Sequence, residues 1–355
     1  MERYAILMAG GSGLRLWPFS RKKKPKQFIS ADSGPCMMLE TLERIRPVVP
    51  PDNCFVVTSR TLEEITRSTL KGTVPESNII LEPMPKNTAA CIAYAVFTLK
   101  SKGIDGVLCF FPADGYVKNR TEYCSAVSRA YAAAEHTEGL VVIGLKPSRP
   151  ATGYGYLRIG PGRPDEARPV LRFVEKPDRS TAEKFLSSGD YLWNSGIVAG
   201  RLSSFSAHIR SFLPKHSRIF SEAMENPDGQ AAGPSIQKAY SEIPDLSFDK
   251  GVLEKSGDIA AVEGNFDWDD IGSLEGLAVP LRPDPDGNRV KGAFFGMDTK
   301  DCIIYGNQTL VAAIGMENVV IALTDDAILV CPRSRAQDVK TLVERLKNSQ
   351  YKQFT

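Results

Sequence analysis

Short apolar runs alternate with amphipathic segments along the first 150 residues. The runs are continuous and contain many β-branched and aromatic residues, which is typical of parallel strands buried on both faces. They lie at residues 4–8, 55–58, 79–81, 107–111 and 140–145. Between them, apolar residues recur at helical spacing at 37–46, 62–70, 87–97 and 123–134. This alternation predicts an α/β fold with a doubly wound, mostly parallel sheet and helices on both of its faces.

The helix predicted from residue 87 has the strongest pattern of these. Five apolar residues between 89 and 97 share one of its faces, so this face should pack on the sheet. Asn87 and Thr88 are residue types that cap helices, and either one can cap this N-terminus.

The pattern changes after residue 150. Glycine and proline are frequent between 147 and 169, which favours hairpins and loops around a site. Helical patterns return near 181–188, 203–212 and 237–240. A linker rich in Pro, Asp and Gly is predicted at 282–288, followed by five short β runs and a final helix near 336–346. We therefore expect a first domain at 1–281 and a smaller, β-rich C-terminal domain at 282–355 that ends in a helix.

Composition and charge narrow the class of protein. Apolar residues make up 42% of the chain and charged residues 24%, which is typical of a globular protein with a sizeable core. The net charge of +2 is too small to hold a long polyanion, so nucleic acid is not an expected partner. No apolar stretch approaches the ~20 residues that span a bilayer. The seven cysteines form no CxxC pair and lie mostly in apolar runs. We expect a cytoplasmic protein.

The most informative segment covers residues 7–21. A strand there leads into a Gly-Gly-x-Gly turn, where backbone N–H groups can approach a phosphate because no Cβ is in the way. Arg15 and Lys26 add the positive charge that a triphosphate needs. The residues expected to bind the nucleotide here are Leu7, Gly10, Gly11 and Gly13.

Two other interpretations of this segment stay open. The glycines are also compatible with an ordinary tight turn. A dinucleotide-binding fingerprint is less compatible, because it requires glycine where this chain has Leu16. The basic run at 21–24 is typical of a solvated surface, so Arg15 and Lys26 carry the phosphate hypothesis.

Seven short motifs, in order, make this sequence resemble the mannose-1-phosphate guanylyltransferases of the sugar nucleotidyltransferase superfamily. The first is Gly-Gly-Ser-Gly-Leu-Arg-Leu-Trp-Pro-x-Ser-Arg from residue 10, with Pro-Lys-Gln at 25–27. The others are Glu-Pro at 82–83 with Asn-Thr-Ala at 87–89, Phe-Pro-Ala-Asp at 111–114, Gly-Tyr-Gly-Tyr at 153–156, Phe-Val-Glu-Lys-Pro at 173–177, Trp-Asn-Ser-Gly at 193–196 and Phe-Asp-Trp-Asp-Asp-Ile-Gly at 266–272. The resemblance covers nearly the whole chain and implies a Rossmann-like nucleotidyltransferase domain with a C-terminal β domain.

Asp114 and Asp270 are the candidate metal ligands. Asp114 follows a buried strand, where open α/β sheets place their ligands, and two carboxylates with phosphate oxygens suit Mg²⁺. The resemblance places the metal on these two positions, with Asp267 and Asp269 as nearby alternatives. From the residues alone, a cap of a helix or turn at Asp114 and a solvated acidic loop at Asp270 are as plausible as a metal site.

Glu82 is the candidate reader of the base. Guanine presents N1–H and N2–H₂ as neighbouring donors, and an ionised carboxylate offers two acceptors at matching spacing. The alternative is an exposed glutamate on a loop. The backbone at Asn87 and Thr88, where a helix is predicted to begin, can add contacts to the base or ribose.

The sugar phosphate is assigned to residues that follow other predicted strands. A surface ion pair is the alternative for Glu175 and Lys176. If they bind substrate, Glu175 can accept from sugar hydroxyls, Lys176 can hold the sugar's phosphate, and the Asn194 amide can both donate to and accept from hydroxyls. Gly153 and Gly196 would let the backbone approach the hexose. The three histidines lie outside every motif, so histidine-based acid–base catalysis is not expected.

The resemblance implies an Mg²⁺-dependent transfer of GMP from GTP to α-D-mannose 1-phosphate, which releases pyrophosphate. Arg15, Lys26 and Lys176 would be its catalytic cations. Two alternatives are a regulatory paralogue that binds GDP-sugars without catalysis, and the same reaction on another hexose 1-phosphate. A homodimer that uses the C-terminal domain is also implied. Since the chain ends soon after that domain, we expect no phosphomannose isomerase module.

Two positions depart from the family's pattern. Leu14 stands where threonine is usual, and Gly115 stands where histidine usually follows the metal-binding aspartate. Loss of the hydroxyl removes one hydrogen bond to phosphate but leaves the backbone N–H, so we expect altered affinity and preserved chemistry.

Overall fold

The computed structural model describes residues 1–11, 13–31, 34–225 and 234–355. The chain packs into two compact units. The first unit contains Met1–Gly10, Leu42–Pro112 and Val117–Trp268, and the second contains Gly11–Thr41, Ala113–Tyr116 and Asp269–Thr355. The units group residues by packing and not by order along the chain, so the sequence-based boundary at residue 282 stays a prediction.

The first unit is built on one nine-stranded sheet. Its strands, in spatial order, are β3 (Ile79–Glu82), β2 (Cys54–Ser59), β1 (Arg3–Met8), β4 (Val107–Pro112), β9 (Tyr191–Arg201), β6 (Leu140–Leu145), β10 (Ile259–Gly264), β8 (Arg168–Glu175) and β7 (Gly155–Ile159). Because β9 is antiparallel to β4 and β6, and β8 is antiparallel to β10 and β7, these two strands run opposite to the other seven. The mostly parallel sheet is thus confirmed.

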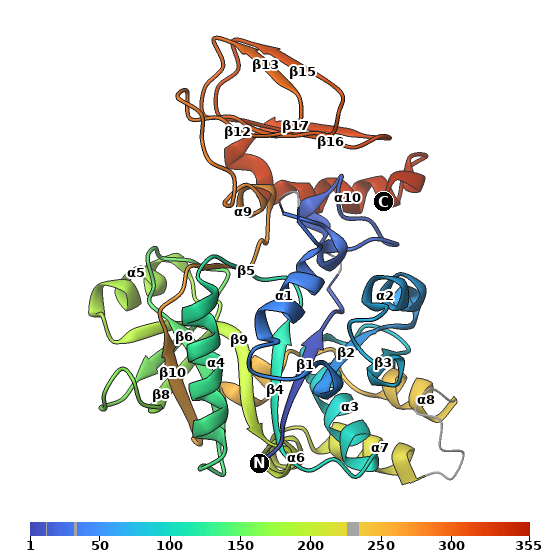
Figure 1. Ribbon diagram of the computed structural model, residues 1–355, viewed down its shortest axis with the longest axis vertical. Helices are drawn as coiled ribbons and strands as arrows, with labels where there is room; N and C mark the ends of the chain where they lie inside the picture. Colours follow the sequence, from blue (N-terminus) through green and yellow to red (C-terminus); the bar gives the residue numbers. More distant parts are fainter. Residues whose placement is uncertain (12, 32–33, 226–233) are drawn as a thin grey trace. The chain divides into compact units, whose positions relative to one another are not determined.

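Alternate residues of these strands pack against different helices. Ile6, Phe110 and Val142 belong to one apolar cluster with residues of α3 (Asn87–Ser101), α6 (Leu202–Phe212) and α7 (Pro214–Glu225). On the opposite face, α4 (Arg120–Ala134) packs along β4, β6, β9 and β10, and its Tyr131 hydroxyl donates to the Tyr4 carbonyl at 2.8 Å. Helices therefore cover both faces of the sheet, as Figure 1 shows for α4 in front of the strands. The doubly wound architecture is confirmed.

Four further helices lie where the sequence predicted them. They are α1 (Met37–Ile45), α2 (Glu63–Leu70), α5 (Arg179–Ser188) and α8 (Pro234–Glu242). Among the described helices, none combines the length and the hydrophobicity that crossing a membrane requires.

The sequence did not predict α7, β9 and β10, and β7 lies where only hairpins and loops were expected. β9 is the strand inserted between the parallel strands β4 and β6. The capping prediction for α3 is wrong, since Lys86 is the N-cap residue and no side chain caps it. Asn87 has a φ of 64°, in the left-handed region, and its side chain accepts from Thr88 N at 2.9 Å.

The second unit combines short strands with the segment 11–41. A four-stranded sheet contains β12 (Arg289–Lys291), β14 (Ile303–Tyr305), β16 (Val319–Leu323) and β17 (Ile328–Pro332), and a second sheet pairs β13 (Phe294–Met297) with β15 (Val311–Ile314). All of these pairs except β16–β17 are parallel. The β13–β15 pair forms one layer, and β12, β16 and β17 form the next. α10 (Val339–Lys347) lies on the other side of this second layer (Figure 1). The predicted β-rich domain with a final helix is confirmed.

The segment 11–41 joins the apolar core of this unit. Leu16, Trp17 and Ile29 pack with Ile303 and Val343. The Trp17 indole N–H donates to the Phe354 carbonyl at 2.7 Å, and Arg21 forms an ion pair of 2.8 Å with Asp326. Arg21 therefore has a structural role. The short helix α9 (Leu274–Leu277) completes the unit, and two short strands, β5 (Tyr116–Val117) and β11 (Trp268–Asp269), pair with each other.

Candidate active site

The glycine-rich segment leaves β1 and brings Lys26 into the interior of the second unit. Gly13 has a φ of 57°, and a Cβ at this position would lie 2.4 Å from the Cβ of Lys26. Any larger residue would displace Lys26, so Gly13 is required by this close approach. Ser12 lies outside the described residues. Arg15, in the turn Leu14–Leu16, is exposed, and it has no ion-pair partner among the described residues.

Lys26 links the two predicted metal-binding residues. Its ammonium lies 3.1 Å from Asp114 Oδ2 and also donates to the backbone carbonyl of Asp270. The Lys26 side chain is 10% exposed, whereas that of Asp114 is 28% exposed. Asp270 is 244 residues from Lys26 in the chain, so only the fold brings it to this cation. The resemblance had assigned these residues to one site, and the structure brings them together.

The Asp270 carboxylate is held by a tight turn. Its Oδ1 accepts from Gly272 N at 3.1 Å, and the neighbouring Asp269 accepts from Ile271 N at 2.8 Å. Within the described residues, no group of three or more His, Cys, Asp or Glu side chains forms a metal cage. A magnesium ion needs only one or two protein carboxylates beside water and phosphate oxygens, so Asp114 and Asp270 fit this ion.

Glu82 lies buried at the end of β3, in the first unit, so it is not an exposed loop residue. The Tyr240 hydroxyl donates to its Oε1 at 3.1 Å, and a Cβ at Gly10 would lie 3.4 Å from its Oε2. Burial raises the pKa of Glu82 to about 7, although the hydrogen bond from Tyr240 favours the ionised form. A carboxylate held with one tyrosine and one glycine around it can receive a pair of N–H donors from a ligand.

The start of α3 is attached to the chain between 245 and 249. The Thr88 hydroxyl accepts from Phe248 N at 2.8 Å, and the Asn87 side-chain amide donates to Asp245 at 3.2 Å. A little earlier in the chain, Tyr240 contacts Glu82, so the residues from 240 to 249 contact Glu82 as well as Asn87 and Thr88. We call residues 240–249 the bridging segment.

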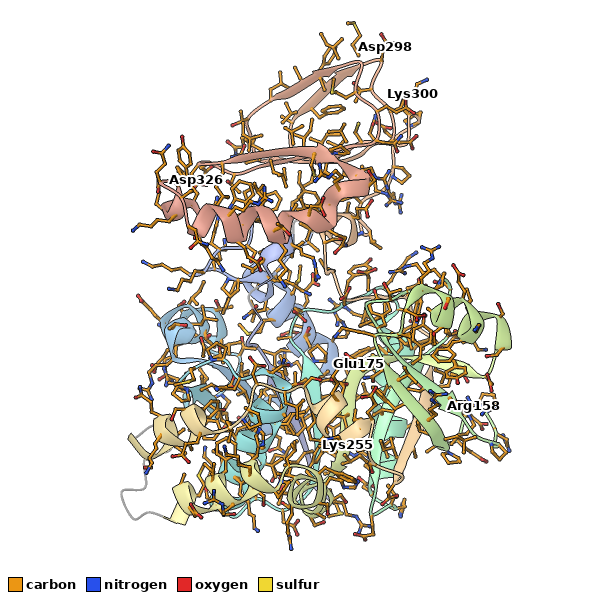
Figure 2. The ribbon with its side chains drawn as sticks, turned by 180° about the vertical axis from the view of Figure 1, so that it is seen from behind. Arg158, Glu175, Lys255, Asp298, Lys300 and Asp326 are labelled. Carbon is orange, nitrogen blue, oxygen red and sulfur yellow. The ribbon has the colours of Figure 1, made fainter. Side chains whose placement is uncertain are left out.

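Glu175 and Lys176 lie together at the end of β8. Their side chains form an ion pair of 2.6 Å, in which Glu175 is 6% exposed and Lys176 is 59% exposed. Figure 2 shows Glu175 in the same sheet as Arg158, which lies on the paired strand β7. Lys176 has a φ of 51°, which is unusual for a residue with a side chain. Such local strain is often found at ligand sites.

Asn194 lies buried on β9 and contacts the last residue of the bridging segment. Its amide nitrogen donates to Asp249 Oδ1 at 2.9 Å, and its Oδ1 accepts from Gly196 N at 3.2 Å. Gly196 has a φ of 76°, and a Cβ there would lie 3.2 Å from Pro112, so glycine is required. Burial, followed by the nearby Glu175, raises the pKa of Asp249 to about 6.

The structure therefore arranges the sequence-predicted residues in three groups. Lys26 joins Asp114 and Asp270 in the second unit, Gly10 flanks Glu82 in the first, and Glu175, Lys176 and Asn194 cluster around Asp249. Gly11 lies beside Asp114, since a Cβ there would be 3.9 Å from its Oδ2. Leu7 is fully buried in the middle of the sheet, between β2 and β4, so the structure does not expose it to a nucleotide as the sequence had predicted. Gly153 is exposed with open space around it.

The sequence analysis missed Tyr240 and Asp249. Tyr240 appeared only within a weak helical pattern, and Asp249 belongs to none of the seven motifs. A buried aromatic hydroxyl requires a partner, which is the only signal that pointed to Tyr240. The three histidines are in no group: His208 and His216 are buried on α6 and α7, and His136 is exposed.

Comparisons with known proteins show the family and the fold of the chain. Residues 4–279 match the family model described as nucleotidyl transferase, and residues 292–346 match the MannoseP isomerase/GMP-like beta-helix domain. A solved structure described as mannose-1-phosphate geranyltransferase from Thermus thermophilus is 34% identical, with a TM-score of 0.87, and the match covers 98% of this chain and 100% of that one.

Curated relatives match over almost the whole chain. The xanthan biosynthesis protein XanB from Xanthomonas campestris pv. campestris (strain B100) is 37% identical over 97% of this chain and 73% of its own length. Mannose-1-phosphate guanylyltransferases from Klebsiella pneumoniae and Escherichia coli are each 36% identical over 98% of this chain and 75% of theirs.

Proposed function

Because the chain belongs to the mannose-1-phosphate guanylyltransferases of the nucleotidyl transferase family, we propose that it converts GTP and α-D-mannose 1-phosphate into GDP-mannose and pyrophosphate. The observation that carries this proposal is the contact of Lys26 with both Asp114 and the Asp270 carbonyl. A buried ammonium among oxygen ligands is suited to a reaction between polyphosphate anions.

The proposed step is a single displacement at phosphorus. An oxygen of the sugar phosphate attacks the α-phosphorus of GTP, the bond from the α-phosphorus to the bridging oxygen breaks, and pyrophosphate leaves with that electron pair. No covalent enzyme intermediate is required. Since both reactants are anions, catalysis consists mainly of positioning and charge neutralisation. Lys26 and Arg15 would stabilise the leaving pyrophosphate, and Lys176 would hold the attacking phosphate.

Nucleotidyltransferases of this kind generally use a divalent metal ion, and we propose Mg²⁺. Asp114 and Asp270 would hold the ion, since their carboxylates are hard oxygen ligands. When bound, the ion neutralises charge on phosphate oxygens. In the absence of such an ion, Lys26 compensates the charge of Asp114.

Two alternative functions use the same geometry. A regulatory paralogue would bind GDP-sugars without turnover, but a pure binder has no need for the buried cation that contacts both aspartates. The second alternative is another hexose 1-phosphate. A panel that crosses four nucleoside triphosphates with three hexose 1-phosphates, measured by pyrophosphate release, separates all three. No release with any pair would contradict the proposed function.

We predict that Glu82→Gln reduces the preference for GTP over inosine triphosphate, which lacks the 2-amino group. Glutamine replaces one acceptor by a donor, so the two guanine donors lose their matched pair, at a cost of about 10–100-fold in kcat/KM for GTP. Competition between the two nucleotides measures the change. The matched control is Glu242→Gln, on the same helix as Tyr240 and exposed. Unchanged selectivity would remove Glu82 from base recognition.

The same assignment predicts how GTP binding depends on pH. The protonated carboxyl cannot accept both guanine donors, and the pKa of Glu82 is raised to about 7 by burial. Affinity should therefore be full above pH 7 and should fall as pH decreases through 7, by about tenfold between pH 8 and pH 6. In Glu82→Gln this dependence should be absent.

A homodimer through the C-terminal domain is also proposed. One face of the β13–β15 pair exposes large apolar side chains: Phe295 is 69% exposed, Met297 51% and Ile314 65%. Met297 is paired with Ile314 in the parallel register, so these side chains share one face. An exposed apolar face of this kind is typical of an interface, and a second copy of the chain is its proposed occupant.

We predict that Phe295→Glu combined with Ile314→Glu yields monomers, because charges are costly to bury at an apolar interface. Sedimentation velocity measures the state. Val330→Glu, on exposed β17 in the other sheet, is the matched control and should leave the dimer intact. Dissociation by Val330→Glu alone would place the interface elsewhere.

The cytoplasmic location stays a prediction that rests on the cysteine pattern.

A further inference from the structure

We propose that Asp249 is a positioning residue of the hexose subsite, which fixes the Asn194 amide and adds a carboxylate to hexose recognition. This inference rests on the proposed function, because it concerns the sugar half of the same substrate. Asp249 belongs to none of the seven motifs that marked the other site residues. It begins a π-helical turn, Asp249–Leu253, and such turns are frequent at functional sites.

Asp249 and Gly196 fix the orientation of the Asn194 amide. This amide can present donor and acceptor in two opposite ways, and only its neighbours select one. Asp249 accepts from the amide nitrogen at 2.9 Å, and the Gly196 N–H donates to Oδ1 at 3.2 Å. The orientation is therefore fixed. Each of the two amide atoms has capacity for one more hydrogen bond, so Asn194 can both donate to and accept from sugar hydroxyls.

Polar and charged groups are concentrated around Asp249. Glu175 is close enough to raise the pKa of Asp249, and Lys176 is close enough to oppose that effect. Glu175 is itself 6% exposed and forms an ion pair with Lys176. Two carboxylates, one amide and one ammonium are thus gathered around the end of β8 and the middle of β9. Repulsion between the carboxylates is costly, and hydroxyl donors from a hexose would relieve that cost.

The chain on both sides of Asp249 is hydrogen-bonded to other elements of the fold. The preceding residue donates to Thr88 at 2.8 Å, and Glu254, at the end of the π-helical turn, accepts from Glu175 N at 2.9 Å. The turn is thereby connected both to α3 and to β8. A side chain on a segment that is held on both sides in this way is preorganised to orient a ligand group.

Binding of GDP-mannose and of GDP alone, measured by calorimetry on the full chain, tests this assignment. Asp249→Ala should weaken GDP-mannose binding by about tenfold or more and leave GDP binding unchanged, because only the hexose contacts are lost. Asp249→Asn can still accept from Asn194, so it should restore most of the affinity. In steady-state kinetics, Asp249→Ala should raise KM for mannose 1-phosphate and leave KM for GTP unchanged. Lys250→Ala, the adjacent exposed residue, is the matched control.

The outcomes separate this inference from the proposed function. Unchanged GDP-mannose binding in Asp249→Ala would overturn the inference, and so would equal weakening of GDP and GDP-mannose, which indicates a general structural role. If the wild type releases no pyrophosphate but Asp249→Ala still loses affinity for GDP-mannose alone, the proposed function fails and the inference holds.

Discussion

Lys26→Ala is expected to lower turnover about 10³-fold, which corresponds to about 4 kcal/mol of transition-state stabilisation. The ammonium is buried, contacts the Asp114 carboxylate and the Asp270 carbonyl, and is the cation that the leaving pyrophosphate would meet. Removal of a fixed cation at a departing polyphosphate has effects of this size in related chemistry. Single-turnover pyrophosphate release measures the chemical step directly.

The variant should remain folded. Loss of the Lys26 contacts costs about 1–3 kcal/mol, which is smaller than the stability of a typical domain. The alanine keeps the Cβ that packs against Gly13. Lys23→Ala, in the exposed basic run, is the matched control and should have wild-type turnover. Equal loss in both variants would show that general positive charge, and not the Lys26 position, matters.

Asp270→Asn is expected to lower turnover about 10²–10³-fold and to raise the Mg²⁺ concentration needed for half-maximal activity. It is the cleaner test of the two metal positions. Its Oδ1 can still accept from Gly272 N, and the backbone carbonyl that Lys26 contacts is unchanged. Asp114→Asn, by contrast, also breaks the ion pair with Lys26. Turnover as a function of Mg²⁺ concentration, with Mn²⁺ binding as a second readout, measures the effect.

Asp267→Asn and Asp269→Asn are the matched controls for this experiment. Asp269 Oδ1 accepts from Ile271 N, and an asparagine can still accept there, so Asp269→Asn should keep the turn and leave the response to Mg²⁺ unchanged. Near wild-type turnover and an unchanged Mg²⁺ response in Asp270→Asn would exclude Asp270 as a metal ligand. A shifted Mg²⁺ response in Asp267→Asn would transfer the role to that residue.

The sequence predicted β1, β2, β3, β4 and β6 well because these strands are continuous apolar runs that are buried on both faces. It failed for β9, where Asn194, Ser195 and Gly196 interrupt the apolar pattern although the first two are buried. Those polar residues lie in the strand because their side chains find partners in the folded chain: Ser195 donates to the Ile143 carbonyl at 2.7 Å. Buried polar residues in a strand thus obscured the strand itself.

The site was predictable to the extent that its residues lie in motifs. Asp114 and Glu82 follow apolar runs, so their place at strand ends could be inferred from the chain alone. Tyr240 and Asp249 could not, because their roles come from contacts with residues 158 and 55 positions away. The capping prediction for Asn87 failed for a similar reason, since its backbone lies in the left-handed region and its side-chain amide donates to the distant Asp245.

The bridging segment has a consequence for how selectivity can diverge among relatives. One stretch of chain supports Glu82 through Tyr240 and Asn194 through Asp249. On the proposed assignments of Glu82 to the base and Asn194 to the sugar, an exchange of this stretch would change both preferences together. A chimaera that receives residues 240–249 from an enzyme that uses another nucleotide should also change the sugar phosphates that it accepts. Exchange of the glycine-rich loop alone should leave both preferences as they were.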